Sequence, residues 1–177
     1  MFKVLTKGCE PTRGSKYSAC VDLYAAEDVV IGAGETKLIG LGVAIDEELL
    51  DSTIVQECDK LGLGMYIDYV GDFKMSHYLQ LMLRSSLGKK GLILPNGVGI
   101  IDLDYKDEIK MIIHNPISRK NTLNFIGSDG VENIRYEITQ IKKGDKIAQI
   151  ALIEHKSYLF GIDTDKERDG GFGSTGS

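Results

Sequence analysis

The stretch PNGVGIIDLDYKDEI, residues 95–109, concentrates side chains that could activate water beside a sugar or base. Asp102 directly follows two isoleucines, so we expect its carboxylate to lie near a buried wall, where it could orient a water molecule. Tyr105 offers a ring that could stack on a sugar or base, and Asn96 and Gly99 suit a tight turn. A structural interpretation remains open, because Asn-Gly is a common hairpin signal and Asp-x-Asp can be a solvated strand face.

A second group of polar residues could hold an anion. The stretch LRSSLGKKG, residues 83–91, places Arg84, Ser85, Ser86 and Lys89 between flexible glycines. Hydroxyl and amide donors next to fixed positive charge are suited to phosphate oxygens. The alternative is an ordinary helix start with a serine as N-cap. The stretch is not a Walker A loop, which needs GxxxxGK followed by Ser or Thr.

Two further features stand near the C-terminus. In the strand-like stretch 142–155, Gln149 interrupts a run of apolar residues, although a lone glutamine in a strand usually faces solvent. The last residues, DGGFGSTGS at 169–177, have the composition of a flexible arm. That arm nevertheless contains one large apolar ring, Phe172, four residues after Arg168.

Length and composition indicate one globular domain with a real core. The chain has 177 residues, of which 42% are hydrophobic and 27% charged. The net charge of -5 argues against direct nucleic-acid binding, which depends on Lys and Arg releasing counterions. It leaves a small phosphorylated ligand open.

The sequence favours a cytoplasmic protein with reduced thiols. Its start has no apolar region of a secretory signal, and no run of 18 apolar residues suggests a membrane span. Cys9, Cys20 and Cys58 are odd in number and too scattered for a metal knuckle or a disulfide framework.

Short β-rich segments between turn signals dominate the chain and favour an all-β sandwich or barrel. We expect strands over residues 36–45, 77–85, 91–96, 108–115, 133–141 and 146–155. One helix is expected over residues 46–62, because Leu50, Ile54, Cys58 and Leu61 recur at helical spacing. The β-branched residues within it leave a strand as the alternative.

Taken in order, five stretches resemble the five motifs of the homotrimeric dUTP pyrophosphatases, or dUTPases. SACVDLYAAED resembles the first and LRSSLGKKG the second, while GVGIIDLDYKDEI is similar to the third, GDKIAQI to the fourth and ERDGGFGSTG to the fifth. The resemblance spans residues 18–176, and five ordered motifs are far more specific than any one of them.

The resemblance implies a dUTPase-like jelly-roll, or β-clip, barrel over residues 1–167, with a short helix and a flexible C-terminal lid over residues 168–177. It implies a homotrimer whose active sites are built from several subunits. It further implies hydrolysis of dUTP to dUMP and pyrophosphate with Mg²⁺, which limits uracil incorporation into DNA and supplies dUMP for dTMP synthesis.

By the same likeness, the third motif supplies the nucleoside end of the site. Asp102 matches the base that orients water toward the α-phosphate. Tyr105 matches the ring under deoxyribose, where a ribose 2′-hydroxyl would clash. Asn96 and Gly99 lie in the hairpin that reads uracil and leaves no room for a 5-methyl group.

The other motifs match the phosphate end and the lid. Arg84, Ser85 and Ser86 of the second motif and Gln149 of the fourth match phosphate contacts, and Asp22 would lie near the water shell of the metal. In the fifth motif Phe172 would stack on uracil. The remaining lid residues would contact phosphates: Arg168, Gly173, Ser174 and Thr175.

Three departures from the family pattern stand out. Extra residues are expected at about 46–76 and 117–137, on the periphery of the barrel, where a regulatory partner could bind. Arg168 precedes Phe172 by four residues, where many members have five. This shortened spacing leaves the phosphate contact of Arg168 open.

Two alternative functions remain. A dCTP deaminase shares the fold, but it needs a glutamate where this chain has Ile112. A non-catalytic nucleotide-binding or regulatory module would be expected to lack Asp102, Tyr105 or the terminal motif, and this chain has all three.

Overall fold

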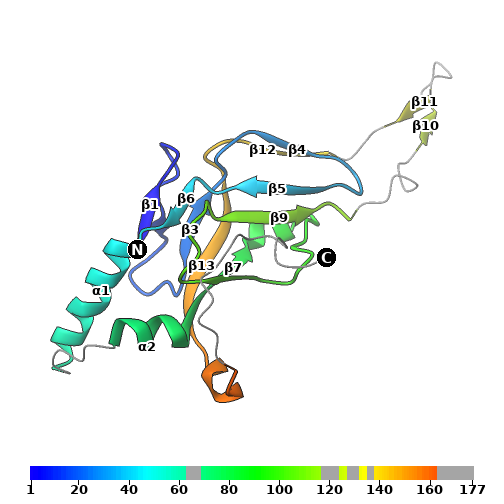
Figure 1. Ribbon diagram of the computed structural model, residues 1–177. Helices are drawn as coiled ribbons and strands as arrows, with labels where there is room; N and C mark the ends of the chain where they lie inside the picture. Colours follow the sequence, from blue (N-terminus) through cyan, green and yellow to red (C-terminus); the bar gives the residue numbers. More distant parts are fainter. Residues whose placement is uncertain (63–68, 117–123, 127–131, 135–137, 163–177) are drawn as a thin grey trace.

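The computed structural model describes residues 1–62, 69–116, 124–126, 132–134 and 138–162 (Figure 1). Its largest sheet has five antiparallel strands in the order β2-β3-β13-β7-β8. These strands are β2 (Thr12–Arg13), β3 (Val21–Tyr24), β13 (Lys146–Glu154), β7 (His77–Leu83) and β8 (Gly99–Asp102).

The remaining strands form antiparallel pairs. The pairs are β1 (Phe2–Val4) with β6 (Val43–Ile45), β4 (Val29–Ile31) with β12 (Thr139–Ile141), β5 (Thr36–Gly40) with β9 (Lys110–His114), and β10 (Asn124–Ile126) with β11 (Glu132–Ile134). Buried leucine and isoleucine side chains from these strands form one core, which includes Leu23, Ile39, Leu79, Met111 and Ile147. The prediction of an all-β fold is therefore confirmed.

Most of the predicted strands are present, with three differences. The segment predicted as one strand at 133–141 contains two, β11 and β12, which pair with β10 and β4, and its residues 135–137 lie outside the described residues.

The other two differences concern the segments 36–45 and 91–96. The segment 36–45 is two strands, because Gly42 breaks it with a φ of 65°. A Cβ at Gly42 would lie 2.8 Å from the Cβ of Cys9, so only glycine fits this corner. The predicted strand 91–96 is wrong: Ile93 forms a single bridge with His114, and Pro95, which has no amide hydrogen, cannot continue a ladder.

The predicted helix is confirmed as α1 (Glu47–Lys60). Asp46 caps it by accepting a hydrogen bond of 3.0 Å from the Leu49 amide. Leu50, Ile54 and Cys58 are buried as expected, but Leu61 is 67% exposed because the helix has already ended.

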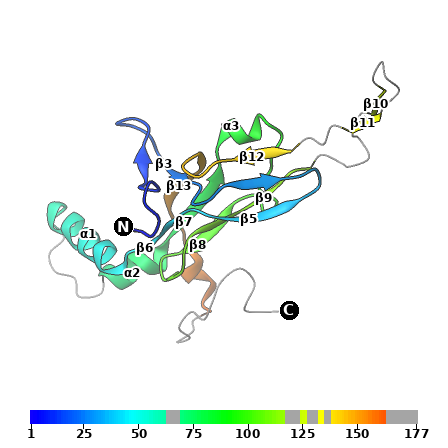
Figure 2. The same ribbon diagram turned by 90° about the horizontal axis from the view of Figure 1, so that it is seen from above.

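A second helix, α2 (Tyr69–Ser76), follows and was not predicted. It leads directly into β7, and its Phe73 ring stacks on His77 with centroids 3.9 Å apart. The His155 amide after β13 donates to the Ser76 carbonyl at 2.7 Å. Both helices fall within residues 46–76, whereas β10 and β11 fall within residues 117–137. Figures 1 and 2 show the helices and this strand pair at opposite ends of the molecule.

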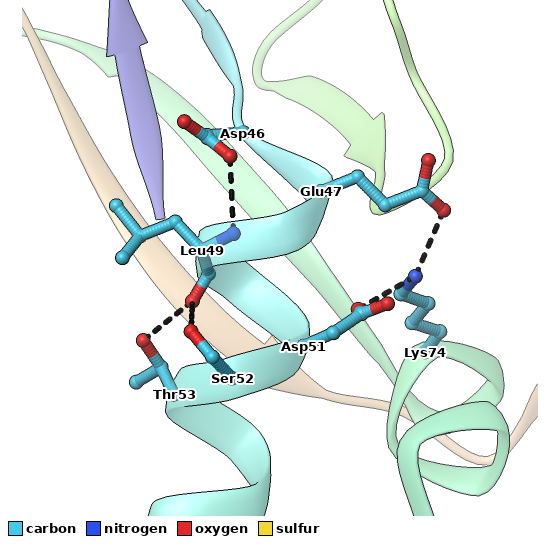
Figure 3. Close-up of polar contacts among 7 residues, drawn as sticks. All are labelled: Asp46, Glu47, Leu49, Asp51, Ser52, Thr53 and Lys74. Carbon is cyan, nitrogen blue, oxygen red and sulfur yellow. Dashed lines mark hydrogen bonds and ion pairs between the residues drawn. The ribbon is translucent and has the colours of Figure 1, made fainter.

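A single lysine joins the two helices (Figure 3). The Lys74 ammonium lies 3.0 Å from Glu47 Oε1 and 2.8 Å from Asp51 Oδ1. Burial alone would lower the pKa of Lys74, but its hydrogen bonds to Asp51 and Glu47 outweigh burial and hold that pKa above its usual value. The same contact holds the pKa of Glu47 below its usual value.

Within the described residues, no helix is long and apolar enough to cross a membrane. The three cysteines are free thiols. Burial raises the pKa of the Cys9 thiol, which lies in the core against the Gly42 corner.

The Lys74 contact predicts a specific loss of stability. Lys74→Met should lower the free energy of unfolding by about 1 kcal/mol at neutral pH, because two carboxylates lose the cation that they share. A carboxyl with a depressed pKa stabilises the fold above its unfolded pKa and loses this effect as pH falls through its folded pKa. The difference between variant and wild type should therefore persist at neutral pH and shrink below the ordinary glutamate pKa of 4.5.

Urea denaturation at several pH values measures this difference. Lys60→Met is the matched control, because among the described residues Lys60 pairs with Glu57 of the same helix and with no other element. Equal destabilisation by both substitutions would contradict the assigned role of Lys74.

Candidate functional site

Three of the predicted nucleoside-binding residues line one cavity. Asn96, Gly99 and Tyr105 meet at a hollow of about 610 Å³ with mostly apolar walls. The opposite wall comes from the β5–β9 pair and contains Thr36, Leu38, Lys110 and Ile112. A hollow of this size and character, with a few polar groups, is typical of a site for a small organic ligand.

The floor of the cavity is shaped by glycine and by a fixed aromatic ring. A Cβ at Gly99 would lie 3.0 Å from the Cβ of Leu81 on β7, so even alanine would require Leu81 to shift by a few tenths of an ångström. The Tyr105 side chain is 93% buried, and its hydroxyl donates a hydrogen bond of 3.2 Å to the Glu108 carbonyl. The Asn96-Gly97 turn is confirmed, with Gly97 at a φ of 74°.

The predicted phosphate residues form a separate charged cluster. Asp22 on β3 lies opposite Gln149 on β13, and Arg84 follows β7, the next strand of the sheet. Arg84 Nε lies 3.1 Å from Asp22 Oδ1, and Lys146 Nζ lies 3.0 Å from Asp22 Oδ2. The hydrogen bond to Asp22 raises the pKa of Lys146, so this amine stays charged at neutral pH.

The serines of the second motif are placed beside this cluster. Ser85 and Ser86 open the short helix α3 (Ser85–Gly88), and both are exposed to solvent. The N-cap of that helix is Arg84, so the alternative in which a serine caps it is wrong. The exposed hydroxyls and the two cations together offer donors to an anion.

Asp102 lies apart from the charged cluster. It ends β8 opposite Tyr78, which is six positions before Arg84 along β7. At 3.3 Å per residue this separation is about 20 Å, far beyond hydrogen-bond reach. The Asp102 side chain is exposed, beside the buried residues Ile101 and Leu103. One chain therefore does not bring Asp102 and Arg84 to the same phosphate group.

The described part of the chain contains no complete set of protein ligands for a metal ion. No three carboxylates, histidines or cysteines there group as metal ligands. Both oxygens of Asp22 face cations, so its donor set fits a metal only through bridging water. The lid residues Arg168, Phe172, Gly173, Ser174 and Thr175 lie outside the described residues.

Curated relatives identify the family. The deoxyuridine 5′-triphosphate nucleotidohydrolase of Nautilia profundicola is 30% identical over 171 residues, which cover 94% of this chain and 89% of that protein. The protein of the same name from Rickettsia akari is 31% identical over 176 residues, covering 96% of this chain and 89% of its own length. The chain belongs to the dUTPase family. No family model matches it.

Solved dUTPase structures share the fold of this chain. The dUTPase from phage phi11 of S. aureus aligns with a TM-score of 0.60 and 22% identity, over 98% of this chain and 97% of that one. The dUTPase of Streptococcus mutans aligns with a TM-score of 0.57 and 22% identity, over 92% of this chain and 98% of its own. These alignments confirm the predicted dUTPase-like jelly-roll fold.

Several residues of the cavity and of the charged cluster were not predicted from the sequence. Lys146 lies in the fourth motif, but nothing in the sequence reveals that β13 brings it to Asp22. The cavity wall formed by Thr36, Leu38 and Lys110 was also missed, because it depends on the long-range pairing of β5 with β9. The place of Lys146 in the fourth motif, three residues before Gln149, indicates that it could contribute to a phosphate site, but it does not identify Asp22 as its partner.

Proposed function

We propose that this chain hydrolyses dUTP to dUMP and pyrophosphate. The observation that carries the proposal is the cavity in which Asn96, Gly99 and Tyr105 meet, since the third motif implies these residues for uracil and deoxyribose. Membership of the dUTPase family supports the same substrate. The reaction removes dUTP from the DNA precursor pool and supplies dUMP for dTMP synthesis.

The cavity explains how a deoxyuridine could be selected. Asn96 and the backbone near Gly99 would hydrogen-bond the polar edge of uracil, and the closed β7–β8 contact would leave no room for a 5-methyl group. The buried Tyr105 ring would pack under the deoxyribose. A rigid ring in this place excludes a ribose, because the extra 2′-hydroxyl would need the same space.

The charged cluster would bind the triphosphate. Arg84 and Lys146 supply positive charge, while Ser85, Ser86 and Gln149 supply neutral hydrogen-bond donors. Asp22 pairs with both cations, one at each carboxylate oxygen, and orients them in the free protein. Mg²⁺ bound by triphosphate oxygens and water would neutralise further charge, and Asp22 could reach it through a water molecule.

Asp102 would act as the base that orients water for attack at the α-phosphate. Because it lies about 20 Å from Arg84 along the sheet, the two residues would reach the same phosphate group only if they came from different copies of the chain. This separation supports a homotrimer with shared sites. The arm at residues 168–177 would close over the nucleotide, with Phe172 on the uracil ring.

The dCTP deaminase alternative is disfavoured by the cavity wall. Ile112, at the position where that enzyme needs a glutamate, lines the cavity with an apolar side chain. Deamination would need a carboxylate there to activate water. No observation favours this reaction over dUTP hydrolysis.

A nucleotide panel tests the proposed function. The protein should release pyrophosphate from dUTP in the presence of Mg²⁺, and much less from dTTP, dCTP or UTP. Removal of Mg²⁺ with a chelator should lower the rate strongly, because the triphosphate then keeps its full charge. Ammonia release from dCTP without pyrophosphate release from dUTP would overturn the proposal.

Asp102→Asn should retain dUTP binding and lose most turnover. The amide preserves the shape of the side chain but cannot take a proton from water, and loss of general-base catalysis typically costs about 10²–10⁴-fold in rate. Calorimetric titration and a pyrophosphate assay measure the two effects separately. Turnover like that of the wild type would show that Asp102 is not the base.

Truncation before Gly170 should lower activity and leave the oligomer intact. The removed arm contains Phe172, whose stacking on a base is worth about 1–3 kcal/mol in comparable contacts. Light scattering should report a trimer for both proteins, and steady-state kinetics should show a raised KM for the truncated one. A fully active monomer would contradict both the shared site and the assembly.

A further inference from the structure

Glu108 links the loop that follows β8 to a distant corner of the fold. Its backbone carbonyl accepts the hydrogen bond from the Tyr105 hydroxyl at 3.2 Å. Its side chain crosses to the turn between β5 and β6, where Oε1 accepts the Gly42 amide hydrogen at a distance of 2.8 Å. Glu108 therefore contacts Tyr105 through its backbone carbonyl and the β5–β6 turn through its side-chain carboxylate.

The turn is shaped to receive this carboxylate. A Cβ at Gly40 would lie 2.6 Å from Glu108 Oε1, so only glycine leaves the space that the side chain occupies. Gly42 has a φ of 65°, a conformation that glycine adopts without strain and that directs its amide toward Glu108. Backbone hydrogen bonds from Leu41 to Ile109 and from Ile109 to Val43 fix the turn beside the next residue of the chain.

We infer that Glu108 is a positioning residue that holds Tyr105 in the orientation that selects deoxyribose over ribose. A hydrogen bond to an ionised acceptor is stronger than a neutral one, so the Gly42 amide fixes the carboxylate firmly. The fixed carboxylate holds the Glu108 backbone, and that backbone holds the Tyr105 hydroxyl. This role rests on the proposed function, because the sugar contact of Tyr105 belongs to it.

The selectivity between dUTP and UTP is the decisive measurement. Glu108→Ala should lower the ratio of kcat/KM for dUTP to that for UTP by about tenfold, the factor that corresponds to one lost hydrogen bond. The change should appear mainly as a lowered KM for UTP, because a displaced ring leaves space for the 2′-hydroxyl, while kcat should change little. A purely structural residue would lower the amount of folded protein without changing this ratio.

Three further variants sharpen the test. Glu108→Gln keeps an oxygen that can accept the Gly42 amide, so it should retain most of the selectivity. Glu108→Asp keeps the charge but withdraws the oxygen by one methylene, so it should lose selectivity even where Glu108→Ala does not fold. Asp107→Ala is the matched control. Asp107 directly precedes Glu108 in the same loop, and its side chain is exposed to solvent.

Hydrogen exchange in the nucleotide-free protein separates this inference from the proposed function. Glu108→Ala should speed exchange at the amides of Tyr105, Ile109 and Gly42, and Asp107→Ala should not. If the wild type failed to hydrolyse dUTP, the proposed function would be wrong. The hydrogen-exchange rates would still show whether Glu108 fixes the loop that contains Tyr105. Unchanged exchange, or a wild-type dUTP preference in Glu108→Ala and Glu108→Asp, would overturn the inference.

Discussion

The antiparallel register of β7 sets the geometry on which the rest of the site depends. This strand pairs with β13 on one side and β8 on the other, so it fixes Gln149 opposite Met82 and Asp102 opposite Tyr78. A slip of one residue would turn every side chain of β7 to the other face of the sheet. The buried Leu79 and Leu81 resist such a slip, because it would expose both to solvent.

That register keeps the Asp102 carboxylate far from the two cations of the charged cluster. The Arg84 and Lys146 cations gather around Asp22 at one end of β7, while the exposed Asp102 carboxylate lies toward its other end. If Asp102 were adjacent to Arg84 in the same chain, the two would form an ion pair, and the carboxylate would be less available to water.

Local sequence signals predicted much of this structure because they depend on nearby residues. The Asn96-Gly97 turn and the helix α1, whose apolar residues recur at helical spacing, depend on local signals, and both are confirmed. The helix α2 was missed because its eight residues include Gly71, a poor helix former, and its Lys74 contact with α1 supplies support that the local sequence does not reveal.

Long-range contacts mark the limit of what the sequence could predict. Periodicity indicates which face of a strand is buried, but it does not identify the partner strand. The contact of Lys146 with Asp22 and that of Glu108 with Gly42 both join residues more than 60 positions apart. Residue type predicted neither pair. Asp22 could have paired with several other basic side chains, and the carboxylate of Glu108 could have accepted a hydrogen bond from many backbone amides.

The helix pair adjoins the end of the sheet that carries Asp102. Helix α2 ends at Ser76, and β7 begins at the next residue, one position before Tyr78. Glu47 at the start of α1 also interacts with the loop that contains Tyr105. The positive charge of Lys106, one residue after Tyr105, adds to the effect of Lys74 and lowers the pKa of Glu47 further. The helix pair is therefore joined to the strand opposite Asp102 and lies within electrostatic reach of the loop that contains Tyr105. The charged cluster, at the other end of β7, depends instead on the pairing of β13 with β3.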